Sequence, residues 1–156
     1  GKKTILLGVT FSLLDFAERY AGLDLSHVIM METGGMKGRR KEMTRAEVHE
    51  QLTAAFNVEK VHSEFGMTEL MSQAYAKKEG IYFPPPWMRV LVRSEEDPFL
   101  LQGSGAGVLV IIDLANYYSC SFIETQDVGR VYEDGSFEVL GRLDLSDIRG
   151  CSLLVV

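Results

Sequence analysis

The sequence predicts an α/β fold: a parallel β/α/β first half with three strands and two helices, followed by a mostly β meander that contains a hairpin. Three observations lead to this prediction. Short apolar runs alternate with helical patterns over the first 65 residues, strand-like runs dominate after about residue 80, and Asp134-Gly135 separates two further strand-like runs. The chain has 156 residues, of which 46% are hydrophobic and 24% charged, as is typical of one globular domain or part of one.

The first half opens with a strand, a helix and a second strand. Thr4–Val9 is a short apolar run, which predicts a buried strand. Ser12 and Asp15 resemble a capping box, which predicts a helix that begins near Ser12 and stops at Gly22. The apolar run at residues 27–31 predicts a second buried strand, and the basic stretch at residues 37–41 is expected to be a solvated loop, or else a contact for phosphate or a partner protein.

A second helix and a third strand complete the parallel half. Thr44 and Glu47 form a capping box at the start of the helix. The apolar residues that follow at helical spacing are Val48, Leu52, Ala55 and Phe56. Residues 57–65 return as a strand, and the alternation of strands with helices predicts a parallel sheet with right-handed crossovers.

The second half is expected to consist of short strands. They are predicted at residues 72–76, 81–83, 87–92, 108–114 and 119–123, and at residues 130–132 and 137–140 around the Asp134-Gly135 turn. Three consecutive prolines, Pro84 to Pro86, exclude a helix at these positions. The glycine-rich residues 103–107 precede a strand and are expected to form a flexible hairpin loop, not a dinucleotide-binding turn.

Composition excludes several classes of protein. The net charge of −6 and the pI of about 5.1 disfavour general nucleic-acid binding, because an acidic surface repels phosphate backbones. The two cysteines are too few for a disulfide scaffold, and Cys120 is expected to be buried inside an apolar strand. No apolar run is long enough for a membrane span and no signal peptide is evident, so a cytoplasmic location is the default expectation.

Two loops at the carboxyl ends of predicted parallel strands are candidates for a ligand site. One contains Gly34 and Gly35, and the other contains Gly66, Thr68 and Glu69. In open parallel sheets such loops lie side by side, and glycines let a ligand approach the backbone. A threonine hydroxyl suits a phosphate or acyl oxygen, and a carboxylate suits Mg²⁺. The alternative is a tight turn followed by a helix N-terminus with a favourable acidic residue.

Two residues of the second half add to these candidates. Asp127 follows an apolar strand, and a carboxylate there suits the hydroxyl groups of a ribose. Arg142 follows the hairpin and suits the same sugar or a phosphate. The alternative is that Asp127 caps a turn and that Arg142 pairs with Asp144 at the surface.

Taken in order, these segments resemble the adenylate-forming superfamily of acyl- and aryl-CoA synthetases, luciferases and adenylation domains. The segments are FGMTEL at residues 65–70, TQDVGRV at 125–131 and DGSFEVLGRLD at 134–144. The flanking words HSEFGMTELMSQAY, DLANYYSCSFIETQD and SDIRGCSLL are similar to the LuxE-type acyl-protein synthetases, the long-chain-fatty-acid–luciferin-component ligases. The likeness extends from about residue 34 to residue 156, and phenylacetate-CoA ligases are the next nearest by pattern.

The resemblance implies an enzyme that uses ATP and Mg²⁺. A carboxylic acid, here a long-chain fatty acid, would attack the α-phosphate of ATP to give acyl-AMP and pyrophosphate, and a thiol would then take the acyl group. By motif, Thr68 would contact the α-phosphate and Glu69 would hold Mg²⁺. Gly34 and Gly35 would line the adenine. The Phe65 ring would lie near the adenine.

The remaining implied roles concern the ribose, the hinge and the acyl acceptor. Asp127 would bind the ribose hydroxyls, and Arg142 would reach the ribose or phosphate. Asp144 matches the position at which a C-terminal lid begins to rotate. Cys151 matches the cysteine that takes the acyl group as a thioester, a task for which a thiolate is suited. The alternative is that Cys151 is a small buried residue at the start of a strand.

Two parts of the superfamily pattern do not occur in the sequence. They are a glycine-, serine- and threonine-rich phosphate loop and a C-terminal lid with a lysine. Gln126 also stands where the wider superfamily has glycine. We therefore expect the chain to be the C-terminal portion of such an enzyme and inactive as a fragment. The alternatives are a ligase that transfers the acyl group to coenzyme A, or a non-catalytic nucleotide-binding or assembly module that partners an acyl-CoA reductase.

Overall fold

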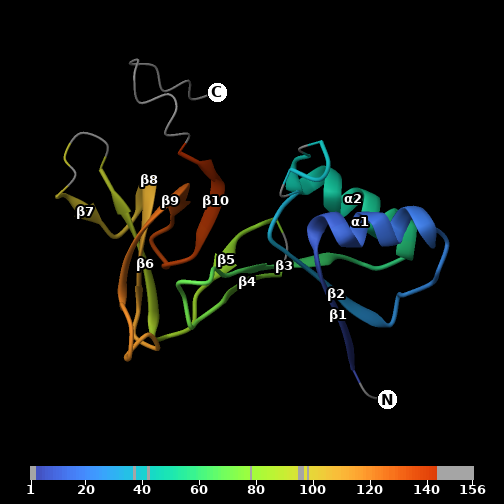
Figure 1. The fold of residues 1–156 in the computed structure, drawn as a ribbon, viewed down its shortest axis with the longest axis horizontal. Coiled ribbons are helices and arrows are strands. Elements are labelled where there is room, and N and C mark those ends of the chain that lie inside the picture. Colours follow the sequence, from blue (N-terminus) through green and yellow to red (C-terminus); the bar gives the residue numbers. More distant parts are fainter. Residues whose placement is uncertain are drawn as a thin grey trace.

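The chain folds into one continuous sheet with helices at one end. The computed structural model describes residues 3–36, 38–41, 43–77, 79–94, 97 and 99–143. These residues form two α-helices and ten strands, and the strands follow the order β1-β2-β3-β4-β5-β10-β9-β8-β6-β7 (Figure 1). Within these ranges no helix is long and apolar enough to cross a membrane.

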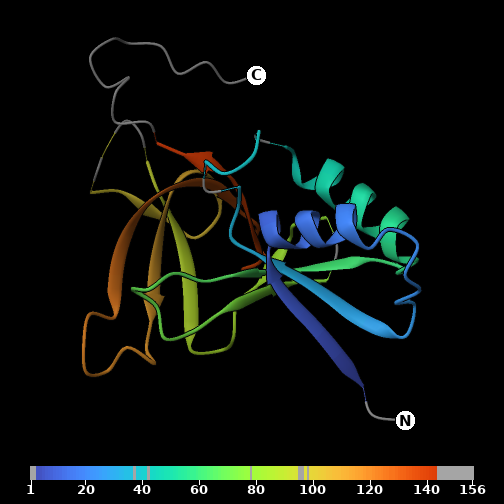
Figure 2. The ribbon, with the colours of Figure 1, turned by 45° about the vertical axis from the view of Figure 1, so that its right-hand side comes forward.

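The first half has the predicted parallel arrangement. Strands β1 (Thr4–Val9), β2 (Val28–Thr33) and β3 (Val61–Phe65) pair in parallel, in that spatial order. Helices α1 (Thr10–Arg19) and α2 (Arg45–Phe56) both cover one face of these strands, as Figure 2 shows. The predicted alternation of strands and helices is therefore confirmed.

An apolar core lies between the two helices and the parallel strands. The Phe16 and Phe56 rings stack with their centroids 5.1 Å apart. The largest fully buried side chains of this core are Leu14, Met30, Leu52, Phe56 and Val61. Burying each such side chain contributes roughly 1.5–3 kcal/mol, which explains why the helices dock on this face.

The two helices begin in different ways. The predicted capping box of α2 is confirmed: Thr44 Oγ1 accepts a hydrogen bond from Glu47 N at 3.3 Å, and Thr44 N donates to Glu47 Oε2 at 2.7 Å. The predicted capping box at Ser12 is wrong. Helix α1 already begins at Thr10. The Thr10 hydroxyl donates to Glu32 Oε2 of β2 at 2.7 Å, so it links the helix to the sheet and does not cap the helix.

The second half is antiparallel and curved. Its strands are β4 (Ala74–Ala76), β5 (Tyr82–Phe83), β6 (Met88–Arg93), β7 (Leu101–Gln102), β8 (Gly105–Asp113), β9 (Phe122–Val131) and β10 (Phe137–Arg142). The hairpin across Gly135 is confirmed, with Phe137 opposite Val131. The expectation of a meander holds only in part, because β10 inserts between β5 and β9 and thereby joins the two halves.

Three expectations for this half are corrected. Asp127 lies within β9 and does not follow a strand, since β9 continues to Val131. Gly105 and Gly107 belong to β8 and not to a flexible loop; a Cβ on Gly107 would lie 2.6 Å from the Arg93 carbonyl oxygen, so glycine lets β8 approach β6 closely. Cys120 is exposed in the turn between β8 and β9, where its thiol donates to the Phe122 carbonyl.

Removing the cap of α2 should destabilise the fold. We expect Thr44→Ala to lower the free energy of unfolding by about 1 kcal/mol, because the Glu47 amide loses its acceptor. Thr53→Ala is the matched control: Thr53 lies within the helix, where its hydroxyl donates to the His49 carbonyl at 2.8 Å and caps nothing. Urea denaturation measures both, and equal effects of the two substitutions would contradict the capping argument.

Candidate functional site

The main cleft of the described residues has a volume of about 800 Å³ and lies where the two halves of the sheet meet. It is lined by the loop after β2, the first turn of α2, the end of β3 and the loop that follows it, β5, the middle of β9, and β10. The lining residues are Gly34, Gly35, Arg45, Glu64, Phe65, Gly66, Met67, Thr68, Glu69, Tyr82, Ile123, Glu124, Thr125, Gln126, Asp127, Val139 and Arg142. Eight residues proposed from the sequence are therefore brought together, from positions up to 108 residues apart (142 − 34).

The two glycine-containing loops lie side by side, as their strand order requires. Thr33 pairs with Glu64 in the parallel register of β2 and β3, and the Thr33 hydroxyl donates to the Glu64 carbonyl oxygen at 3.3 Å. Gly34 has a φ of +71°, a conformation that L side chains rarely adopt. The turn after β2 therefore runs directly beside the end of β3.

Phe65 lies deeper than the sequence suggested. Its side chain is only 9% exposed, and its ring packs edge-on against Phe137 at 5.2 Å and tilted against Tyr82 at 5.7 Å. The ring lines the cleft while belonging to the core of the antiparallel half. The aromatic cluster thus fixes the end of β3, from which the next loop departs.

The β3–β4 loop (residues 66–73) places Thr68 and Glu69 at the cleft with exposed side chains. The neighbouring Leu70 is buried and anchors the loop in the core. Thr68 and Glu69 do not begin a helix, so the alternative of a helix N-terminus is excluded for this segment.

A buried carboxylate holds this loop on the side that faces the core. Asp113, at the end of β8, is fully buried and accepts hydrogen bonds from Met71 N at 3.0 Å, Ser72 N at 2.8 Å and Ser72 Oγ at 2.6 Å. Ala115 N adds a fourth bond at 3.1 Å. Burial alone would raise the pKa of Asp113, but these hydrogen bonds lower it overall. The hydrogen bonds therefore favour the ionised form of Asp113.

Asp127 and Arg142 face each other across β9 and β10. They are paired in the strand register, and Arg142 Nε lies 3.3 Å from Asp127 Oδ1. Burial raises the pKa of Asp127, and the positive charge of Arg142 partly opposes that rise. The Arg142 side chain is 73% exposed, so its guanidinium is accessible to a ligand in the cleft.

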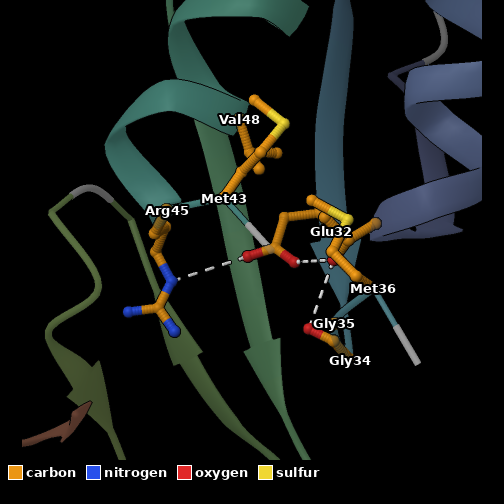
Figure 3. A pocket seen from close by; sticks show the side chains of 8 residues that line it. Glu32, Gly34, Gly35, Met36, Met43, Arg45 and Val48 are labelled. Atoms are coloured by element: carbon orange, nitrogen blue, oxygen red, sulfur yellow. Dashed lines mark hydrogen bonds and ion pairs between the residues drawn. The ribbon is translucent and has the colours of Figure 1, made fainter. Parts of the chain in front are cut away.

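A second, smaller cavity of about 110 Å³ lies behind Gly34 and Gly35, and sequence reasoning did not find it. Its key residue is Glu32, which accepts from Thr10 on one side and lies 3.8 Å from Arg45 Nε on the other (Figure 3). Burial would raise the Glu32 pKa, but hydrogen bonds from His49, Ser63 and Thr10 and the charge of Arg45 lower it overall. The signal available in the sequence was an acidic residue at the end of an apolar run, two positions before Gly34 and Gly35.

Arg45 links this cavity to the main cleft. It lines both, and its guanidinium lies over the Tyr82 ring, 5.3 Å from the centroid. Neither Glu32 nor Tyr82 is near Arg45 in the sequence, so no local pattern indicates this position. Its position shows that the first turn of α2 belongs to the wall of the cleft.

The basic stretch at residues 37–41 does not contribute to the cleft through its described residues. Arg40 Nε donates to Asp15 Oδ1 at 2.8 Å and Arg40 Nη1 to Glu18 Oε1 at 2.7 Å, so the guanidinium clamps the loop to α1. Lys37 lies outside the described residues, as do Asp144 and Cys151. The hinge and acyl-acceptor predictions therefore stay predictions.

The charges of the cleft bear on a metal ion. Four of its lining residues carry carboxylates, namely Glu64, Glu69, Glu124 and Asp127, whereas Arg45 and Arg142 carry the positive charges. Arg93 lies outside the lining and pairs with Glu124, Nε to Oε1, at 3.1 Å. A polyanion that entered this cleft would be repelled by the acidic lining. A divalent cation bound with the polyanion would reduce this repulsion, so such a cation fits the charges of the cleft. The described side chains offer no group of three or more His, Cys, Asp or Glu residues that could hold a metal by themselves.

Comparison with solved structures identifies the fold. Coronafacic acid ligase from Pectobacterium brasiliense superposes with a TM-score of 0.64 at 17% identity, over 88% of this chain and 29% of that one. MatB from Rhodopseudomonas palustris gives a TM-score of 0.62 at 18% identity, over 89% and 31%. A benzoate CoA ligase from Burkholderia xenovorans gives 0.56 at 19% identity, also over 89% and 31%.

The chain therefore has the fold of part of these ligases. It spans less than a third of the length of these three ligases. No protein-family model matches the chain. No curated protein matches it either.

Replacing Asp113 should change how stability depends on pH. A carboxyl whose pKa is lowered by folding contributes stability above its unfolded pKa of about 4, and this contribution is lost as the pH falls through the folded pKa. We expect Asp113→Asn to cost about 1–3 kcal/mol at pH 7, because loop amides lose an acceptor, and to flatten the fall in stability below about pH 4. Denaturation between pH 7 and pH 2.5 tests this; an unchanged acid slope would contradict it.

Proposed function

We propose that this chain supplies the nucleotide-binding part of a ligase that activates a carboxylic acid as acyl-AMP. The observation that carries the proposal is the convergence of Gly34, Thr68, Glu69, Asp127 and Arg142 on one cleft. All of these residues except Gly34 come from three motifs that keep the order of the adenylate-forming superfamily, and the fold agrees with that superfamily.

The proposed reaction consumes one carboxylate and one ATP. A carboxylate oxygen attacks the α-phosphorus, the bond from that phosphorus to the bridging oxygen breaks, and pyrophosphate leaves with both electrons of that bond. The Thr68 hydroxyl donates a hydrogen bond to an α-phosphate oxygen. Glu69 would hold Mg²⁺, whose positive charge would offset the charge of the phosphate oxygens. The substrate class is a carboxylic acid, and a long-chain fatty acid is our specific proposal.

The rest of the cleft would bind and orient the nucleotide. Asp127 accepts hydrogen bonds from the ribose hydroxyls, and Arg142 partly offsets the rise in the Asp127 pKa that burial causes. The exposed guanidinium of Arg142 reaches the sugar or a phosphate. Gly34 and Gly35 let the flat base approach the backbone. Such orientation is the main contribution that a binding cleft makes to a two-substrate reaction.

Two thiol acceptors are in question for the second step. Transfer to Cys151 would release AMP and leave a thioester on the protein, as the acyl-protein synthetase words of the sequence suggest. Transfer to coenzyme A is the second candidate, and the fold likeness to a benzoate CoA ligase favours it. In either case the thiolate attacks the acyl carbonyl carbon and AMP leaves.

Removing the Asp127 carboxylate should weaken nucleotide binding. We expect Asp127→Ala to lower the affinity of the intact protein for ATP by roughly 10- to 100-fold, because hydrogen bonds to a charged group contribute about 1.5–3 kcal/mol. Asp24→Ala is the control, since Asp24 bonds to Ser26 and Asn57 and does not line the cleft. Calorimetry measures both. If the intact protein binds neither ATP nor an acyl-AMP analogue, the proposal fails.

Replacing each cysteine in turn distinguishes the two acceptors. If Cys151 carries the acyl group, Cys151→Ser should abolish covalent labelling of the intact protein by a radioactive fatty acid, while ATP–pyrophosphate exchange continues. Cys120→Ser is the matched control and should keep the label, although Cys120 is exposed. Unchanged formation of a CoA thioester by Cys151→Ser, with no protein label in either variant, would instead support coenzyme A as acceptor.

A further inference from the structure

The loop that carries Thr68 and Glu69 is held mainly by another element. The β3–β4 loop has a turn bond of its own, from Leu70 N to the Met67 carbonyl oxygen at 3.0 Å. Below it lies the end of β8, where Asp113 takes three bonds from Met71 and Ser72. Trp87 extends the network by donating its indole N–H to Ser72 Oγ at 2.9 Å.

A second attachment, from the turn between β8 and β9, holds the middle of the loop. Asn116 Nδ2 donates to the Glu69 carbonyl oxygen at 2.7 Å. Asn116 is buried, and the Ser119 hydroxyl donates to its Oδ1 at 3.1 Å, which fixes the orientation of the amide. The amide thus fastens the backbone of the residue whose side chain faces the cleft.

The loop has a buried part, which the two attachments hold, and an exposed part at the cleft. Ser72 and Leu70 are buried, whereas Thr68 and Glu69 are exposed at the cleft. Residues 71 and 72 are held by Asp113 and residue 69 by Asn116, so the loop is tied on the C-terminal side of Thr68 and at Glu69. A loop without such ties has many conformations, and few of them would direct both side chains at one ligand.

From this geometry we propose that Asn116, supported by Asp113, is a positioning residue that holds Thr68 and Glu69 in the geometry that phosphate and Mg²⁺ require. The inference rests on the proposed function for the roles of Thr68 and Glu69. Asn116 does not line the cleft, so its effect on the reaction passes through the Glu69 backbone. The turn between β8 and β9 becomes part of the catalytic apparatus without touching substrate.

The test uses a double-mutant cycle in the intact protein. Asn116→Asp keeps the size of the side chain but loses the donor, and it brings a carboxylate against the Glu69 carbonyl. We expect kcat for ATP–pyrophosphate exchange to fall roughly 10- to 100-fold and the Mg²⁺ requirement to rise, because a displacement of about 1 Å can cost that much. In a Glu69→Gln background the same substitution should have a clearly smaller effect, because of the two side chains that Asn116 positions only Thr68 keeps its function.

Hydrogen exchange supplies a readout that does not depend on catalysis. We expect amides of residues 66–73 to exchange faster in Asn116→Asp than in the unaltered protein, with exchange in β8 unchanged. Ser136→Ala is the matched control: Ser136 is also buried and donates to Asp134, but in the β9–β10 turn away from the loop. It should change neither kcat nor exchange in residues 66–73. Should Asn116→Asp fail to fold, Ser119→Ala loosens the same amide and should have a smaller effect in the same direction.

The possible failures are distinguishable. A full-size loss of kcat from Asn116→Asp in the Glu69→Gln background would overturn the inference, as would unchanged exchange in residues 66–73. If Glu69→Gln alone leaves activity intact, the proposed role of Glu69 fails and the positioning inference fails with it, even if exchange shows that Asn116 orders the loop.

Discussion

The pairing of β3 decides the architecture of this protein. β3 is parallel to β2 on one side and antiparallel to β4 on the other, so the helix-covered half and the curved half share one continuous sheet. Because the carboxyl ends of parallel strands lie at the same edge of the sheet, the loops after β2 and β3 lie side by side. The antiparallel partner then leads the chain into the second half, whose strands β9 and β10 form the opposite wall. A cleft follows from this change of direction at a single strand.

Two buried carboxylates stabilise the loops on either side of that strand. Glu32 is held by the Thr10 hydroxyl and by Arg45 and His49, and it lies behind the glycines of the first loop. Asp113 is held by amide and hydroxyl groups under the second loop. Buried charges are costly unless they are satisfied, so each carboxylate fixes the groups that surround it. The two buried carboxylates and their partners thus lie beneath the surface of the site, and they position the exposed residues of the loops.

Much of the fold could be predicted, because its signals are local. The apolar run of β1, the capping box at Thr44 and the turn at Gly135 each depend on residues a few positions apart. The errors arose where a long-range partner prevailed. Thr10 bonds to Glu32, 22 residues away, and α1 begins earlier than Ser12 suggested. Gly107 lies in a strand because the backbone of β6 is close to it, and Cys120 is exposed because β8 ends before reaching it.

The chemical groups of the candidate site and their order can be identified in the sequence: two glycines, a Thr-Glu pair, an aspartate and an arginine. The sequence also predicts, through the parallel strands, that the first two loops are neighbours. That Asp127 and Arg142 face those loops depends on the fold, because β10 inserts beside β5 and not at the sheet edge. The structure alone revealed Arg45, Glu32, Asp113 and Asn116. Their contacts join residues 13 to 47 positions apart, and such contacts arise from packing, which no local pattern encodes.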